Sequence, residues 1–279
     1  MEYREFAPSA RLAPFVERLW TLTDGSSGLV GVEQPILPDG RPELVMHFGD
    51  PFNRVARSGI VVRQPITLFA GQLTEQLTLE PTGAVAVLGV RFHPFGASAF
   101  LRVPIHLLNG LTIGVDEISI SLAAALARVR SVTSDVSVAA TLVQRALEES
   151  LEDQQPDARL ALATRMILNS GGTMSIDTLA VKVSMTRRHL ERRFLAGVGI
   201  GPKRLARIIR FQRALRVLER ADAPRAGAVT AAECGYADQS HFIREFRELA
   251  GCSPAQHLLT QGELTGFFVT GSRVSSRRP

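Results

Sequence analysis

The sequence predicts an α+β protein with a β-rich N-terminal part, a helical connector and an all-α C-terminal part. Three observations support this. β-Branched runs separated by turn signals fill the first 110 residues, Ala- and Leu-rich stretches follow, and a hexapeptide pattern then occurs twice. We expect a β-rich domain at 1–115, a connector with a linker at 116–156, a helical domain at 157–260 and a partly disordered tail at 261–279.

The β-rich domain is predicted from short apolar runs. Glu43–Phe48, Gly59–Arg63 and Ala84–Phe92 are typical of strands, and Pro38-Asp39-Gly40 and Glu80–Gly83 are turn signals. Several short strands joined by turns favour a small barrel or sandwich.

The connector is predicted as two helices, around Leu122–Ala127 and Ala139–Val143, followed by a polar linker at Glu152–Pro156. Amphipathic Leu/Ala-rich helices bury an apolar stripe, so if two chains associate as a homodimer we expect residues 117–150 to form the contact.

The C-terminal part contains only helical signals. Arg159–Leu168 is stopped by Asn169–Gly172, Ser175 caps the next helix, and Thr186 caps another that runs to about Leu195. Pro202 begins a longer helix that ends near Arg220 and spans about 27 Å. Adjacent major-groove faces of DNA lie about 34 Å apart.

The duplicated hexapeptide is the most informative feature of the chain. His189–Phe194 and His241–Phe246 both follow the pattern His-apolar-x-Arg-x-Phe, 52 residues apart. Each copy sits in a unit of helix, short turn and Arg-bearing helix, the arrangement of a helix-turn-helix.

Charge divides the chain in the same place. Residues 1–156 carry 12 arginines and 17 acidic residues, whereas residues 157–279 carry 20 basic and 10 acidic residues. The basic half is typical of a protein that binds a polyanion. Only Lys182 and Lys203 of the 32 basic residues are lysine, and arginine suits phosphates and guanine edges.

Helical periodicity separates the two faces of each second helix. Leu190 and Phe194 must face the core in the first module, and Phe242 and Phe246 in the second. The outward residues can hydrogen-bond guanine, adenine or cytosine, and Ile243 can contact a thymine methyl. The predicted DNA-binding residues are Thr186, Arg187, Arg188, Glu191, Arg192, Gln239, Ser240, Ile243 and Arg244.

The segment Gly235–Phe246, followed by Gly251–Pro254, resembles the C-terminal signature of AraC/XylS-type transcriptional regulators. The resemblance covers about residues 157–260. It implies a seven-helix domain in which two helix-turn-helix modules, joined by a long helix, bind promoter DNA, with RNA polymerase as a further partner. It places base-reading positions on seven of the residues above (188, 191, 192, 239, 240, 243 and 244). The chain departs from the family at Ser184, where glycine is usual, and at Gly227 and Thr230, where apolar residues are usual.

A weaker resemblance covers the N-terminal part. Pro35–Val45 and Gly89–Ala97 are similar to motifs in the sensor-like domain of one subgroup of these regulators, which implies a cupin-like domain that senses a small-molecule effector or supports dimerisation. Gly96 precedes an apparent helix near Arg91 and His93, so an anionic effector could bind there; an ordinary strand-to-helix turn is the alternative.

Other chemistries receive little support. His47, His93 and His106 lack the close His-x-His pair of metal-binding cupins, and two cysteines cannot form a four-cysteine zinc site, so we expect neither metal nor cofactor. We expect a cytoplasmic, non-enzymatic protein without a membrane span. Two alternatives stay open: a cupin-like enzyme tethered to a DNA-binding module, and a non-specific DNA binder.

Overall fold

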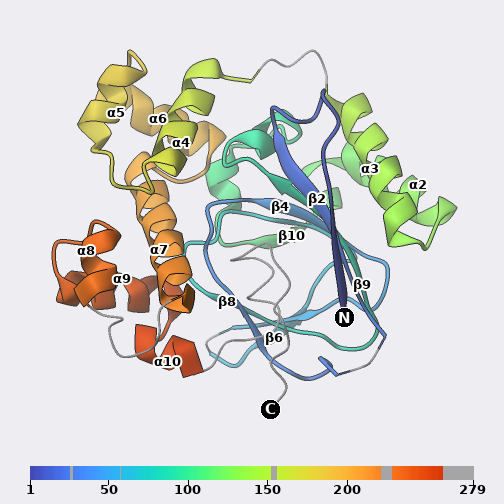
Figure 1. The fold of residues 1–279 in the computed structure, drawn as a ribbon. Helices are drawn as coiled ribbons and strands as arrows, with labels where there is room; N and C mark the ends of the chain where they lie inside the picture. Colours follow the sequence, from blue (N-terminus) through green and yellow to red (C-terminus); the bar gives the residue numbers. More distant parts are fainter. Residues whose placement is uncertain (26–27, 57, 152–155, 221–227, 260–279) are drawn as a thin grey trace.

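The computed structural model describes residues 1–25, 28–56, 58–151, 156–220 and 228–259. Its N-terminal domain consists of two antiparallel sheets (Figure 1). The larger sheet has the order β1 (Glu2–Phe6), β2 (Val16–Asp24), β9 (Val85–Phe92), β4 (Glu43–His47), β7 (Thr67–Ala70), β10 (Thr112–Gly114). The smaller has the order β3 (Gln34–Ile36), β8 (Leu77–Glu80), β5 (Asn53–Val55), β6 (Val61–Arg63). The predicted α+β class is confirmed, with a β-rich N-terminal domain.

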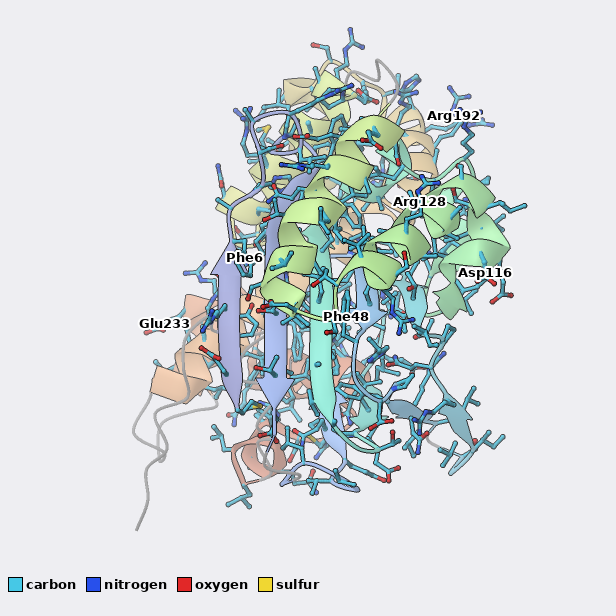
Figure 2. The ribbon with its side chains drawn as sticks, turned by 90° about the vertical axis from the view of Figure 1, so that its right-hand side faces the viewer. Phe6, Phe48, Asp116, Arg128, Arg192 and Glu233 are labelled. Atoms are coloured by element: carbon cyan, nitrogen blue, oxygen red, sulfur yellow. The ribbon has the colours of Figure 1, made fainter. Side chains whose placement is uncertain are left out.

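The connector helices complete the core of this domain. Two short 3-10 helices, η1 (Gly96–Ala99) and η2 (Ile105–Leu108), lead to α1 (Val115–Ile118), α2 (Ile120–Val132) and α3 (Val136–Ser150). Figure 2 shows α2 and α3 lying over the larger sheet. Their apolar stripe, including Leu126, Val143 and Leu147, is buried in one cluster with strand residues. The stripe predicted to pair two chains therefore packs on the chain's own sheet; a homodimer contact would have to use the outer faces, where Ile120 and Val132 are exposed.

The C-terminal domain contains the seven helices that the family resemblance implies, all within the described residues. They are α4 (Ala158–Asn169), α5 (Ile176–Lys182), α6 (Arg187–Gly197), α7 (Pro202–Arg220), α8 (Ala228–Glu233), α9 (Gln239–Ala250) and α10 (Pro254–Leu259). Ser175 and Thr186 cap α5 and α6 as predicted. Residues 152–155 of the predicted linker at Glu152–Pro156, the predicted tail at 261–279 and Gly227 lie outside the described residues.

The two domains meet along α7 (Figure 1). Leu37 of the N-terminal domain is buried in the core of the C-terminal domain, and the buried Gln212 side chain donates to the Pro38 carbonyl at 2.7 Å. Gly40 follows with a φ of +78°, and a Cβ there would lie 2.7 Å from Leu205 Cδ1. Glycine therefore allows this loop to lie directly against the helix. We call residues 37–41 the joint loop.

The turn of the first helix-turn-helix contains the one non-glycine residue with a positive φ in the described part of the chain. Ser184 has a φ of +54°, whereas the corresponding turn of the second module has Gly235 at +75°. A left-handed conformation brings the Cβ of an L-residue close to its own backbone, which costs about 1 kcal/mol.

Replacing Ser184 with glycine should relieve this strain. We expect Ser184→Gly to raise the free energy of unfolding by about 0.5–1 kcal/mol, because glycine adopts this φ without a steric cost. Urea denaturation measures the change. Ser131→Gly in the helix α2 is the control and should lower stability, since glycine disfavours helices. Equal losses in both variants would contradict the strain argument.

Candidate nucleic-acid interface

Helix α6 separates its buried and exposed faces as predicted. The Thr186 hydroxyl accepts from the His189 amide at 3.2 Å and starts the helix. Leu190 and Phe194 are fully buried, which anchors the helix on the core. The opposite face leaves a row of predicted DNA-binding side chains exposed: Arg187, Arg188, Glu191 and Arg192.

Arg187 and Glu191 form an ion pair with each other. Arg187 Nε lies 3.2 Å from Glu191 Oε1, one turn along the helix, and Arg187 Nη1 lies 3.4 Å from Asp177. Arg188 and Arg192 instead border a small hollow of about 280 Å³ with Thr186 and His189. Neither Arg188 nor Arg192 forms an ion pair in the described part of the chain.

Helix α9 repeats this arrangement. The Asp238 carboxylate accepts from the His241 amide at 2.7 Å, and Phe242 and Phe246 are fully buried. Gln239, Ser240 and Arg244 are exposed, whereas Ile243 is half-buried against the edge of the core. Ile243 therefore offers less surface than the sequence predicted.

The two histidines of the repeated pattern have structural contacts. His241 packs edge-on against Tyr236, with ring centroids 5.4 Å apart, and its Nδ1 accepts from the Ala237 amide at 3.4 Å. His189 is exposed, with Nδ1 3.5 Å from Arg192. Thr230 is buried although the family usually has an apolar residue there, so the short helix α8 packs its polar side chain inward.

One position of the repeat differs between the modules, and sequence reasoning missed its role. Arg193 forms an ion pair with Asp157, the residue that caps α4. At the matching position Glu245 is buried and accepts from Arg207 at 2.8 Å and Arg210 at 3.0 Å, both on α7. Glu245 lies three residues after Phe242 and four before Leu249, so helical spacing puts it on the inward face. A carboxylate on that face needs cationic partners, and this was the signal that could have revealed its role.

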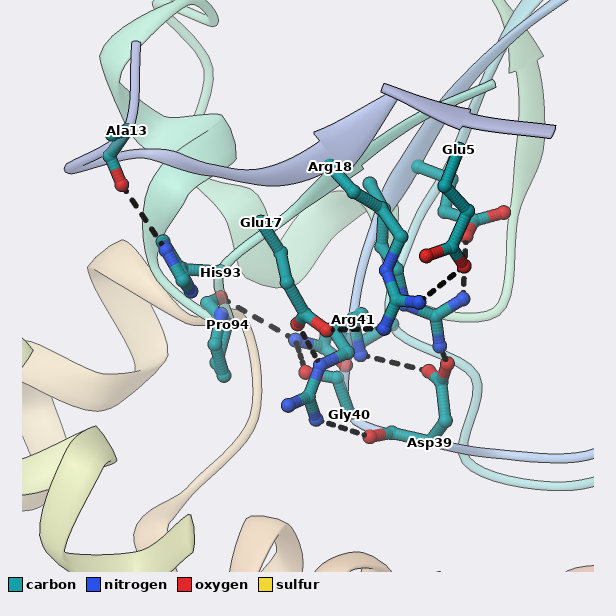
Figure 3. A network of polar contacts seen from close by, with 12 residues as sticks. Glu5, Ala13, Glu17, Arg18, Asp39, Gly40, Arg41, His93 and Pro94 are labelled. Atoms are coloured by element: carbon teal, nitrogen blue, oxygen red, sulfur yellow. Dashed lines mark hydrogen bonds and ion pairs between the residues drawn. The ribbon is translucent and has the colours of Figure 1, made fainter. Parts of the chain in front are cut away.

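The candidate anion-binding pair Arg91 and His93 is engaged by the protein itself, and Figure 3 shows His93 pointing toward the Ala13 carbonyl. Arg91 is 5% exposed, forms an ion pair with Asp39, and lies 3.0 Å from Glu43. His93 Nε2 lies 3.2 Å from the Ala13 carbonyl oxygen. These contacts agree with the alternative, a strand-to-helix turn, and any anion there would compete with two carboxylates.

The same cluster stiffens the joint loop. Arg41 forms an ion pair with Glu17, which also lies 2.7 Å from Arg18. Burial by itself would raise the pKa of Glu17, but the charge and hydrogen bond of Arg41, together with Arg91 and Arg18, lower it to about 2. The charged side chains of this cluster in the N-terminal domain are therefore paired with one another.

An apolar cavity of about 80 Å³ lies between the two sheets, beside this cluster. Trp20, Leu22, Leu68 and Leu77 are among its walls, and Asp39, Arg41 and Glu43 line one side. His47 is fully buried in its wall, with Nε2 3.2 Å from the Gln64 amide oxygen and Nδ1 without a hydrogen-bond partner in the described part of the chain. Burial lowers the pKa of His47 to about 4, so its imidazole is neutral at pH 7.

The described residues contain no group of three or more His, Cys, Asp or Glu side chains placed to hold a metal ion. None of their helices is both long enough and apolar enough to cross a bilayer.

Comparisons with known proteins agree with this architecture. Residues 179–259 match a family described as a helix-turn-helix domain, and residues 4–114 match a domain of unknown function (DUF6597). A search of curated proteins finds no match.

Among solved structures, ToxT from Vibrio cholerae O395 is similar at 11% identity and a TM-score of 0.45, covering 90% of this chain and 99% of that one. Unsaturated fatty acid bound ToxT from strain SCE256 is similar at 12% identity and a TM-score of 0.41, with 91% and 97% covered. The AraC-like transcriptional activator CuxR is similar at 14% identity and a TM-score of 0.29, with 84% and 98% covered. With its family match, duplicated motif and paired helix-turn-helix modules, this chain is a DNA-binding transcription regulator whose C-terminal helix-turn-helix domain resembles that of AraC/XylS-type regulators.

Proposed function

We propose that the two modules bind adjacent major grooves of one duplex, with α6 and α9 as the base-reading helices. One observation carries the proposal: both helices anchor by buried Leu or Phe side chains and expose Arg, Gln and Ser on the opposite face. Helix α7, 19 residues and about 28 Å long, joins the modules. This length is close to the roughly 34 Å between adjacent major-groove faces.

Selection of bound fragments from sheared genomic DNA at near-physiological salt tests this proposal. We expect enrichment of fragments that carry two half-motifs about one helical turn apart. The double variant Arg188→Ala/Arg192→Ala should lose the enrichment, because each bidentate Arg–guanine contact contributes about 1–3 kcal/mol of discrimination.

Arg165→Ala provides the matched control, since it removes an exposed arginine from α4 of the same domain. It should retain the preferred fragments. Uniform recovery of all fragments that disappears with modest salt would show a non-specific binder instead.

We further propose that the cavity between the sheets binds a small neutral, largely apolar molecule. Its walls are mostly aliphatic and aromatic, and the orphan Nδ1 of His47 offers one hydrogen bond. Because burial keeps this imidazole uncharged, it would not neutralise a carboxylate. Leu37, Asp39 and Arg41 belong both to the cavity lining and to the joint loop on α7. A ligand would thus act on DNA binding through α7.

The neutral state of His47 predicts how stability depends on pH. The unfolded histidine titrates near 6.5, whereas the folded one titrates near 4, so the unfolded state binds more protons between these values. Stability is therefore complete above about pH 6.5 and falls by about 2–3 kcal/mol as the pH drops to about 4. His47→Gln should remove most of this dependence of stability on pH, whereas His106→Gln, which replaces an exposed histidine, should retain it. Identical slopes in the two variants would exclude a buried neutral His47.

A thermal-shift screen of small neutral alcohols and ketones tests the cavity. We expect compounds that raise Tm to lose their effect in His47→Leu, which removes the polar group but keeps an apolar wall. His93→Gln, whose histidine does not line the cavity, is the control and should retain the shift. Shifts of equal size in both variants would place the ligand elsewhere.

A further inference from the structure

A charged cleft of about 580 Å³ lies between the two helix-turn-helix modules. Its floor is one face of α7, with Lys203, Arg207 and Arg210. One wall is formed by the segment from Gly172 to Asp177 and by Arg187 at the start of α6. The other wall is formed by residues of α9: His241, Arg244, Glu245 and Glu248. The cleft is thus bordered by the starts of both candidate base-reading helices.

Cations outnumber carboxylates in this cleft. Among the described residues that line it, five are Arg or Lys (Arg187, Lys203, Arg207, Arg210 and Arg244) and three are acidic (Asp177, Glu245 and Glu248). Glu245 is held by Arg207 and Arg210, and Glu248 by Arg204 and Arg207. The side chains of Lys203 and Arg244 form neither a hydrogen bond nor an ion pair within the described part of the chain, and both are exposed. Positive charge is therefore available for an anionic ligand.

The Glu245 carboxylate also holds the arginine side chains at the floor of the cleft in place. Glu245 is 3% exposed and takes hydrogen bonds from the guanidinium groups of both Arg207 and Arg210. Arg210 is further fixed over the Tyr236 ring, with Cζ 4.7 Å from the centroid. Arg207 donates from Nε to Glu245 and from Nη2 to Glu248, which leaves its Nη1 without a partner in the described part of the chain, and 23% of its side chain is exposed.

We propose that this cleft binds the phosphodiester backbone of the DNA segment between the two major grooves, with Lys203 and Arg207 as its phosphate contacts. The inference rests on the proposed function, because a duplex that receives both α6 and α9 must pass its intervening backbone across the cleft that they border. Contacts of this kind fix register and orientation and carry no base preference. They would set the spacing at which the two modules bind.

The chain offers an internal control for this proposal, because Lys182 and Lys203 are its only lysines. Both are exposed, but Lys182 ends α5 and does not line the cleft. Acetylation of the full chain with an amine-reactive ester, followed by peptide mass spectrometry, reports both side chains in one sample. The probe is a preferred duplex from the fragment selection. We expect this duplex to slow acetylation of Lys203 several-fold and to leave Lys182 unchanged.

Substitution gives a second measurement. Lys203→Gln should lower the slope of log affinity against log salt by about 0.9 and weaken binding to preferred and random duplexes equally, whereas Lys182→Gln should change neither. Sequence-preferring binding with equal acetylation of both lysines and an unchanged salt slope would overturn the phosphate contact while leaving the proposed function intact. Absence of sequence-preferring binding in the unmodified protein would instead contradict the proposed function.

Discussion

The position of every functional surface in this protein depends on the burial of α7. Leu205, Ile208, Phe211 and Leu215 are fully buried, and the helix contacts α4 and α6 of the first module as well as α8, α9 and α10 of the second. A helix with one face buried from Leu205 to Leu218 cannot turn without opening an apolar core, which would cost several kcal/mol. The distance and angle between α6 and α9 are therefore set by one rigid element.

The N-terminal domain contacts that element through the joint loop and through Arg204, which donates to the Thr74 carbonyl at 2.7 Å. It also contacts the first module, because η1 and η2 pack against α6 and Asn109 donates to the Gly199 carbonyl at 2.6 Å, just before α7. The loop is itself held by the ion pairs of Asp39 and Arg41, and buried charges of this kind are strongly destabilising when one partner is lost. A rearrangement at the cavity would thus move the loop as a unit against α7.

Sequence reasoning succeeded where one local rule decides the outcome. The caps Ser175 and Thr186 and the anchors Leu190 and Phe242 follow from residue type and helical spacing, because capping and the 3.6-residue period act over one or two turns. It could not identify partners that are distant in the sequence: it left Arg91 open as an anion contact beside an ordinary turn, and Asp39, 52 residues away, forms an ion pair with it. Likewise, the connector helices showed an apolar stripe, but periodicity cannot tell whether a sheet or a second chain covers it.

Arg193 and Glu245 occupy equivalent positions of the repeat but have different partners, so the two modules are attached to α7 in different ways. Arg193 is half-exposed in its pair with Asp157, and such surface pairs contribute about 0–1 kcal/mol. Glu245 is buried between two arginines of α7, and breaking such a cluster costs about 3–5 kcal/mol. Both modules pack on α7, and the second adds a buried ion cluster to that helix, whereas Arg193 and Asp157 both lie outside α7. Loss of the Glu245 carboxylate should accordingly loosen α9 from α7, whereas loss of Arg193 should leave α6 anchored by the buried Leu190 and Phe194.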